Sequence, residues 1–222
     1  LAMAYGDIDP DFDDGYTNGV HVLFPPPKPL PGNYTTSLAA WSWGLMRGMD
    51  MLEKESAIDA KKVAVIGLSR LGKAALLAGA KDDRFAVVIP VQTGGGGTPL
   101  AKRDYGENVS TQNEKFPHWF CGNFRKYSDN EAALPFDQHM LLAACAPRPL
   151  YVSSFPGKWF DPYGEFLSMK AAEPVYTFLG LPGLPATEWP AELTPVSSTH
   201  LGYHRRPGEH SVSLYDWSCY LA

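Results

Sequence analysis

Ser69 stands in a setting that could turn a serine into a nucleophile. It follows Val63–Gly67, a run without alternation that is typical of a strand buried on both faces. It precedes LGKAALLAGA, a stretch of strong helix propensity. Such a strand–turn–helix lifts a serine hydroxyl above a sheet edge and directs helix N–H groups at a reacting oxygen. Leu71 replaces the second glycine of G-x-S-x-G and Gly72 follows, so a plain helix N-cap stays open as an alternative.

A histidine near the end of the chain could supply the base. His210 lies in PGEHSV, before a closing helix predicted over Ser211–Leu221. It follows the serine, the order in which one large class of serine hydrolases carries nucleophile and base. A neutral imidazole near pH 7 can take the serine proton and later return it. His204 and His200 compete with His210 for this role.

The elements that must position these groups alternate between strand and helix. Apolar and aromatic residues recur at helical spacing over Ser37–Glu53. The patterns predict further strands over Leu1–Tyr5, Phe85–Pro90 and Pro149–Ser154, a helix over Tyr163–Leu179, and a surface loop over Gly180–Pro195. This alternation predicts an α/β protein with a mostly parallel sheet and helices on both faces, in one domain over residues 1–222.

Composition and spacing exclude several other functions. The net charge is −5 without a basic patch, which argues against a nucleic-acid partner. No apolar run approaches the roughly 18 residues needed to span a bilayer. Gly94–Gly97 lacks the features of a phosphate-binding loop, and the Asp-rich GDIDPDFDDG lacks EF-hand spacing. The widely spaced cysteines and isolated histidines form no metal-ligand pattern. We therefore expect no metal and no cofactor.

The serine turn, G-L-S-R-L-G-K, resembles the G-x-S-R-x-G-K turn of the glucuronoyl esterases, carbohydrate esterase family 15. The blocks DDRFAVVIP, TGGGG, YGEN, FPHWFCGNF, LPFDQHMLLAACAPRPLYV, DPYGEF and LYDW, with GDIDPDFDDG, also resemble bacterial members. The resemblance implies an α/β-hydrolase fold and a serine esterase. It would hydrolyse esters of (4-O-methyl-)glucuronic acid, as in lignin–glucuronoxylan links, through an acyl-enzyme on Ser69. It also implies a monomeric, secreted or periplasmic protein, and a chain that lacks the N-terminal strands of the sheet.

The resemblance assigns further site residues. The main-chain N–H and the guanidinium of Arg70 would hold the oxyanion, with a solvated surface arginine as the alternative. Lys73 and Glu107 would contact hydroxyls of the glucuronic acid ring, and Trp159 would border the sugar pocket. The alternatives are a solvated helix lysine, a helix-start carboxylate and a core tryptophan. His204, in GYH, looks structural.

The acid of the expected triad is missing. The two positions that carry it in the family are Gln92 and Gly157 in this chain. Gln92 could fix the imidazole tautomer but could not offset an imidazolium charge. Asp161 is the nearest surviving carboxylate and could replace the acid, or it could cap the following helix. Two other functions therefore stay open, a pseudo-esterase that binds uronic-acid glycans and a general carbohydrate esterase acting on acetyl or methyl esters.

Overall fold

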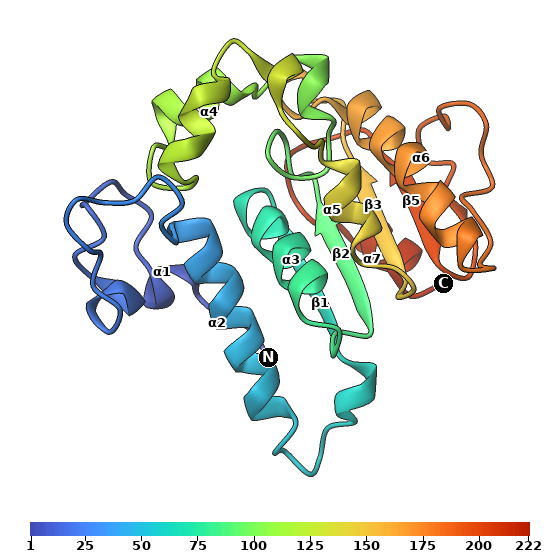
Figure 1. Ribbon diagram of the computed structural model, residues 1–222. Coiled ribbons are helices and arrows are strands. Elements are labelled where there is room, and N and C mark those ends of the chain that lie inside the picture. Colours follow the sequence, from blue (N-terminus) through green and yellow to red (C-terminus); the bar gives the residue numbers. More distant parts are fainter.

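A five-stranded sheet lies at the centre of the molecule, which a computed structural model describes over residues 1–222. The strands are β1 (Ala64–Leu68), β2 (Val87–Val91), β3 (Leu150–Ser154), β4 (Val196–Ser197) and β5 (Leu201–Arg205). Their spatial order is β1-β2-β3-β5-β4 (Figure 1). Only β4 runs antiparallel to its neighbour. The predicted mostly parallel sheet is confirmed.

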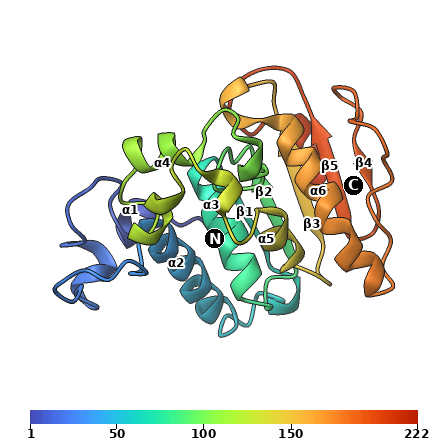
Figure 2. The ribbon, with the colours of Figure 1, turned by 45° about the horizontal axis from the view of Figure 1, so that its top comes forward.

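Helices lie on both faces of this sheet. The helices α3 (Arg70–Lys81), α5 (His139–Ala143) and α6 (Pro162–Phe178) lie on one face (Figure 2), and α7 (Leu214–Tyr220) lies behind the sheet in Figure 1. On one face, residues of α3, α5 and α6 share a core with the strands, and the buried Glu165 of α6 accepts a hydrogen bond from Ser154 of β3. On the other face, the hydroxyl of Tyr220 in α7 lies 2.6 Å from that of Ser153. The side chains of Ser153 and Ser154 therefore point to opposite faces of the sheet, as expected for neighbouring residues of a pleated strand.

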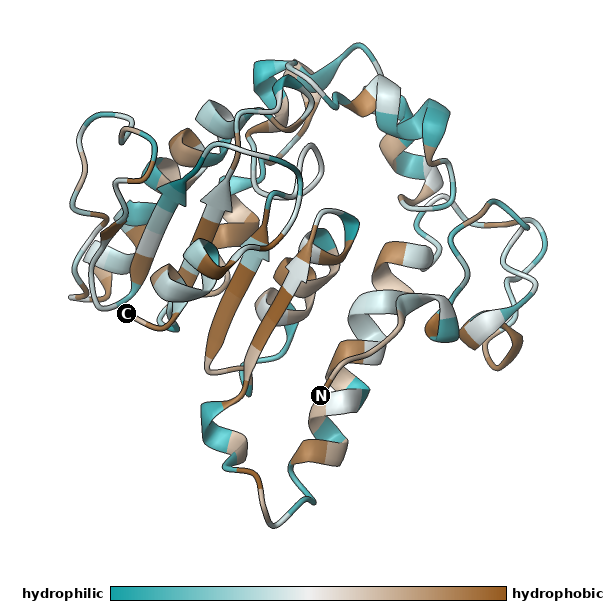
Figure 3. Cartoon of the chain, turned by 180° about the vertical axis from the view of Figure 1, so that it is seen from behind, coloured by the Kyte–Doolittle hydropathy of each residue, from teal (hydrophilic) through white to brown (hydrophobic).

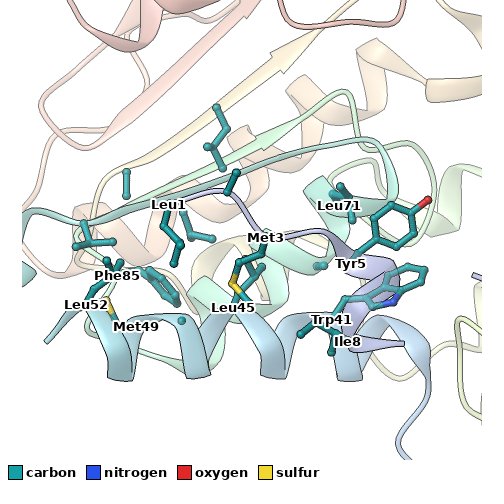
Figure 4. A pocket seen from close by; sticks show the side chains of 17 residues that line it. Leu1, Met3, Tyr5, Ile8, Trp41, Leu45, Met49, Leu52, Leu71 and Phe85 are labelled. Atoms are coloured by element: carbon teal, nitrogen blue, oxygen red, sulfur yellow. The ribbon is translucent and has the colours of Figure 1, made fainter. Parts of the chain in front are cut away.

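The strand predicted over Leu1–Tyr5 is wrong. Residues 1–4 have no regular structure, and the short helix α1 (Tyr5–Ile8) begins where the strand was expected to end. These residues pack on α2 (Ser37–Leu52), where a Cβ on Gly48 would come within 2.8 Å of the Met3 sulfur. Leu1, Ala2 and Met3 line one side of an apolar pocket of about 310 Å³ between α2 and β1 (Figure 4). The apolar pattern therefore marks packing against a helix and not strand pairing.

The other predicted elements are confirmed to within a few residues. The helix predicted over Ser37–Glu53 is α2, and the one over Tyr163–Leu179 is α6, with Gly180–Pro195 as a loop after it. Strands β4 and β5 were not predicted individually. The chain also contains α4 (Val109–Lys115) and short 3-10 turns. No helix combines the length and apolar character needed to cross a bilayer.

The main core lies between the sheet and the layer of α3, α5 and α6. Strands β1 and β2 are apolar along most of their length, as Figure 3 shows in brown. Leu76, Val152 and Met169 are fully buried there. Truncating one such side chain to alanine typically costs about 2–5 kcal/mol. This core holds the carboxyl ends of β1, β2, β3 and β5 side by side.

Candidate active site

Ser69 forms a sharp turn between β1 and α3. Its backbone has φ 60° and ψ −127°, a left-handed conformation that a non-glycine residue rarely adopts. Its N–H donates to the carbonyl of Val91 at 2.9 Å, which fixes the turn on the neighbouring strand. The Ser69 side chain makes no capping hydrogen bond to α3. The structure therefore does not support the N-cap alternative, and the hydroxyl remains available for chemistry.

Two glycines let the strand and the helix approach each other through this turn. A Cβ on Gly67 would lie 2.2 Å from the carbonyl oxygen of Leu71. A Cβ on Gly72 would lie 2.8 Å from the carbonyl oxygen of Gly67. Gly72 thus supplies the close approach that a glycine at position 71 was expected to supply. The departure from G-x-S-x-G does not disturb the geometry of the turn.

His210 is held by Gln92, one of the two positions where the family's acid was expected. Gln92 follows β2, and His210 lies in the loop between β5 and α7, so parallel strand ends bring them together. The Nδ1 atom of His210 lies 2.8 Å from Oε1 of Gln92. Gln92 is fully buried and has φ 46°. The imidazole packs against Phe155 and Phe160, with ring centroids 5.2 and 4.3 Å away.

The second hydrogen bond of Gln92 fixes the tautomer of His210. Nε2 of Gln92 donates to the carbonyl of Ser211 at 3.1 Å. A carbonyl can only accept, so the amide must turn its NH₂ toward Ser211 and its oxygen toward His210. An amide oxygen also only accepts, so Nδ1 of His210 carries the proton. Nε2 of His210 is then the basic nitrogen, the one a serine base needs.

The electrostatic surroundings keep His210 neutral. Burial lowers the pKa of His210, and nearby positive charges, Lys73 foremost, lower it further. The loop that carries it is held by Arg206, which is 5 % exposed and donates to the carbonyls of Glu209 and Ser211 at 3.3 and 2.7 Å. Arg206 in turn binds the buried Asp216 at 2.7 Å. No carboxylate hydrogen-bonds to His210 in the structure.

Lys73 and Glu107 form a buried ion pair. Their Nζ and Oε2 atoms lie 2.8 Å apart, with side chains 3 % and 2 % exposed. Burial lowers the pKa of Lys73, and the Glu107 carboxylate opposes that shift. Lys73 is therefore not the solvated helix lysine that was its alternative. Glu107 lies just before Asn108, the N-cap of α4, but its carboxylate binds Lys73. A buried ion pair whose ammonium and carboxylate have further hydrogen-bonding capacity is suited to sugar hydroxyls.

The glycine run after β2 makes room for Glu107. A Cβ on Gly95 would lie 1.7 Å from the Glu107 carbonyl oxygen. A Cβ on Gly94, which has φ +67°, would lie 2.5 Å from Oε2 of the same residue. The run therefore packs tightly beside the site, because the main-chain carbonyl and the carboxylate of Glu107 occupy the space that side chains at Gly95 and Gly94 would need.

Arg70 is not a free surface arginine. Its Nη1 donates to Oδ2 of Asp11 in the N-terminal Asp-rich segment. Its guanidinium carbon lies 4.9 Å from the ring centroid of Trp119, and Lys73 Nζ lies 4.8 Å from the same ring. The Trp119 ring thus lies close to both cations of the site, Arg70 and Lys73, and cation–π attraction favours this arrangement.

Trp159 lies outside the main core. It belongs to a 3-10 turn over Lys158–Phe160, is partly exposed, and has Lys115 Nζ 4.7 Å from its ring centroid. Its carbonyl accepts from the N–H of Glu107 at 2.9 Å. The core alternative is therefore wrong, and the main chain of Trp159 is attached to the segment that carries Glu107.

Asp161 does not take the place of the missing acid. Its carboxylate caps α6 by accepting from the N–H of Gly164 at 3.0 Å. It also binds Nε of Arg103 at 2.8 Å. The expectation that Asp161 supports His210 is wrong, because Asp161 binds the helix start and Arg103 while Nδ1 of His210 binds Gln92.

The competing histidines have other environments. His204 is fully buried in β5, with Nε2 2.9 Å from Oδ1 of Asp216 and Nδ1 3.1 Å from the Tyr151 hydroxyl. Both ring nitrogens are occupied, which fits the structural role expected for it. His200 bonds the Thr199 hydroxyl at the start of β5.

The sequence did not reveal several residues that organise this site. Asp11, Trp119, Arg206 and Asp216 escaped notice because their partners lie far away in the chain or are backbone carbonyls. Glu165 is another: it is fully buried and accepts from Thr98 at 2.8 Å and from the N–H of Thr93 at 3.2 Å. Burial raises the pKa of Glu165 to about 7. The family-like blocks carried the only signal, since GDIDPDFDDG, FPHWFCGNF, DPYGEF and LYDW contain Asp11, Trp119, Glu165 and Asp216.

The sheet order, the strained serine after β1 and the histidine after β5 define the chain as an α/β-hydrolase-fold protein. It matches the family described as "Glucuronyl esterase, fungi" over residues 31–180. It is 49% identical over 220 residues to the carbohydrate esterase MZ0003 from an unknown prokaryotic organism, covering 97% of this chain and 50% of the relative. It is 37% identical to 4-O-methyl-glucuronoyl methylesterase 1 of Phanerochaete chrysosporium, covering 74% of this chain and 39% of that protein.

A solved structure agrees with the sequence relatives. The glucuronoyl esterase from Solibacter usitatus superposes with a TM-score of 0.91 at 47% identity, covering 98% of this chain and 56% of that one. The chain belongs to the glucuronyl esterase family, carbohydrate esterase family 15. It spans about half the length of these bacterial relatives.

Proposed function

We propose that the protein is a serine esterase that hydrolyses esters of glucuronic acid, including the 4-O-methyl form. The observation that carries the proposal is the 2.8 Å contact between His210 Nδ1 and Gln92 Oε1, because it leaves the basic nitrogen of His210 free for a serine proton. The names of the family relatives support this substrate class. Esters that link lignin to glucuronoxylan are the natural substrates that we propose.

The reaction proceeds in two balanced halves. Ser69 Oγ bonds to the ester carbonyl carbon while its proton passes to Nε2 of His210, and the carbonyl electron pair moves to the oxygen. The N–H and guanidinium of Arg70 stabilise this oxyanion. When the intermediate collapses, the C–O bond to the alcohol breaks and the alcohol takes the proton from His210. Water then repeats the sequence on the acyl-enzyme, which releases glucuronic acid and restores Ser69.

The substrate's sugar ring contacts three further residues. Lys73 donates to, and Glu107 accepts from, the ring hydroxyls, which satisfies the buried ion pair with polar partners. Trp159 borders the pocket and covers C–H surface of the ring. A neutral alkyl ester that lacks the hydroxyls leaves these groups without partners, so it is a poorer substrate.

Hydrolysis of benzyl glucuronate by the purified chain tests the proposal. We expect turnover in the wild-type chain and in Asp161→Asn, and none in Ser69→Ala. Turnover that is lost in Asp161→Asn at an unchanged melting temperature would restore Asp161 as the acid. A folded wild-type chain that releases no alcohol would overturn the proposed activity.

The absence of a carboxylate at His210 favours one second candidate, a pseudo-esterase that binds uronic-acid glycans through Lys73, Glu107 and Trp159. Glycan binding that is unchanged in Ser69→Ala, together with no turnover, would establish it. A general carbohydrate esterase is separated from both by comparing acetylated xylan with glucuronate esters. Because a polymeric substrate lies outside the cell, we place the protein in the secreted or periplasmic space, where it acts as a monomer.

A further inference from the structure

The Asp-rich segment GDIDPDFDDG reaches the active site through a single side chain. Asp11 is 13 % exposed, and its two carboxylate oxygens have separate partners. Oδ1 lies 2.9 Å from Nε2 of His118 and accepts from the Trp119 indole at 2.7 Å. Oδ2 accepts from Nη1 of Arg70. The carboxylate therefore joins two anchoring residues to the guanidinium beside Ser69.

We propose that Asp11 is a positioning residue that holds the Arg70 guanidinium against Trp119, where it can meet the oxyanion. If the Asp11 carboxylate were removed, the Arg70 side chain would have no charged partner. The main-chain N–H of Arg70 would keep its place at the start of α3. Long arginine side chains carry much rotamer freedom, and fixing one in advance lowers the free energy needed to use it in the transition state. This inference rests on the proposed role of Arg70 in ester hydrolysis.

The electrostatics agree with this geometry. Burial raises the pKa of Asp11, but the hydrogen bonds from His118, Trp119 and Arg70 outweigh it and lower the pKa to about 2. Asp11 is therefore ionised across the whole working pH range. The other side chains of the segment differ, because Asp13 is exposed and lies beside no cation of the site.

Asparagine is a selective replacement at this position. Asp11→Asn can keep an oxygen toward His118 and Trp119 while it presents an NH₂ group to Arg70. It thus removes the arginine contact and spares the two anchors. Asp13→Asn removes the same charge from the same segment and is the matched control.

Two readouts test the inference. One is kcat and KM for benzyl glucuronate, and the other is the rate at which a fluorophosphonate probe labels Ser69, which needs no sugar recognition. We expect Asp11→Asn to lower both kcat and the labelling rate about 10- to 100-fold, and to leave KM within about twofold of the wild-type value. The loss should not exceed the one that follows removal of a whole oxyanion hydrogen-bond donor. Asp13→Asn stays at the wild-type rate. In an Arg70→Ala background, Asp11→Asn has less than about a twofold effect.

The outcomes separate this inference from the proposed function. Wild-type rates in Asp11→Asn, or an equal loss in the Arg70→Ala background, overturn the positioning role alone. Normal labelling without glucuronate hydrolysis overturns the substrate alone, and no labelling of the folded wild-type chain overturns both. If Asp11→Asn does not fold, Asp11→Glu keeps the charge and moves it by one methylene. A positioning role then predicts a lower kcat, whereas a structural role predicts only a lower melting temperature.

Discussion

His204 and His210 lie in the same segment and have opposite surroundings. His204 is fully buried and has a carboxylate partner, with Asp216 at 2.9 Å and the Tyr151 hydroxyl at 3.1 Å. His210 lies in a loop at the carboxyl end of the sheet and has an amide partner, Gln92. By hydrogen-bond partner alone, His204 resembles the histidine of a catalytic triad more closely.

The difference shows that a His–Asp pair is not by itself a sign of catalysis. Both nitrogens of His204 are held by buried side chains, Asp216 and Tyr151, so neither nitrogen faces a serine or a substrate. His210 has one bonded nitrogen and one free nitrogen, which is what a base requires. Asp216 instead binds His204, Arg206 and the start of α7. Burial raises the pKa of Asp216, but these hydrogen bonds outweigh it and leave the pKa well below the ordinary range. The Asp216 carboxylate holds the His210 loop indirectly, through Arg206, whereas the Gln92 amide orients the imidazole directly.

The largest expected effect comes from removing His210. We expect His210→Ala to lower kcat for benzyl glucuronate about 10³-fold, the usual contribution of a general acid–base group, at an unchanged melting temperature. His200→Ala is the matched control, since it removes a histidine from the same segment outside the site. A comparable loss of kcat in His200→Ala, or none in His210→Ala, would break the distinction between the two histidines.

Removing His204 should act on stability. His204→Asn leaves Oδ1 of Asp216 with one partner fewer in the core, which costs about 2–3 kcal/mol because the lost hydrogen bond is to a buried charge. Urea unfolding with an unchanged slope measures this loss. Turnover per folded molecule should remain close to the wild-type value. A fall in turnover at full stability would mean that His204 takes part in the reaction.

Most of the fold follows from local pattern, whereas the partners within the site do not. The apolar runs at β1, β2 and β3 and the helical spacing of α2 and α6 are visible in the sequence because each reflects its own burial. Strand β5 contains glycine, tyrosine and a buried histidine, so its pattern does not indicate a strand. The first residues mislead because an apolar stretch that packs on Gly48 looks like one that joins a sheet.

Within the site, residue types were easier to predict than contacts. Ser69 and His210 carry chemistry that their residue types and positions indicate, whereas Lys73 and Glu107 were assigned through the family resemblance. The orientation of Gln92 depends on the carbonyl of Ser211, 119 residues away in the chain, and Arg70 depends on Asp11, 59 residues away. Tertiary packing determines these pairings, and no local pattern encodes them.

Giving His210 a carboxylate should sharpen the comparison. Gln92→Glu places a negative charge beside Nδ1, which stabilises the imidazolium that forms in the transition state. We expect kcat to rise about 10-fold. This gain is smaller than the roughly 10⁴-fold loss that follows when a triad acid becomes an amide, because the new carboxylate is repelled by the carbonyl oxygen of Ser211. Gln138→Glu is the control, because Gln138 is also buried but bonds the carbonyl of Gly97 and not His210. An unchanged or lower kcat would mean that the amide suits this site better.

The pH profile should respond in the same direction. His210 acts as a base only when neutral, and its pKa lies below the ordinary value, so kcat/KM should rise with pH through a midpoint below about 6.5 and then stay level. In Gln92→Glu the new charge favours the imidazolium, so the midpoint moves to higher pH. A midpoint that stays in place in this variant would show that another group controls the acid limb.

The smallest effect concerns Asp161, the carboxylate that could have replaced the missing acid. Asp161→Ala removes the cap of α6 and the contact with Arg103, and should lower stability by about 1 kcal/mol, the usual cost of losing an N-cap. Asp161→Asn can still accept from the N–H of Gly164, so it should lose less. Neither variant should change kcat measured on folded protein. A large fall in kcat in both variants, with melting temperatures near the wild-type value, would show that Asp161 is the carboxylate partner of His210. His210 and His204 would then no longer differ in the type of their partner.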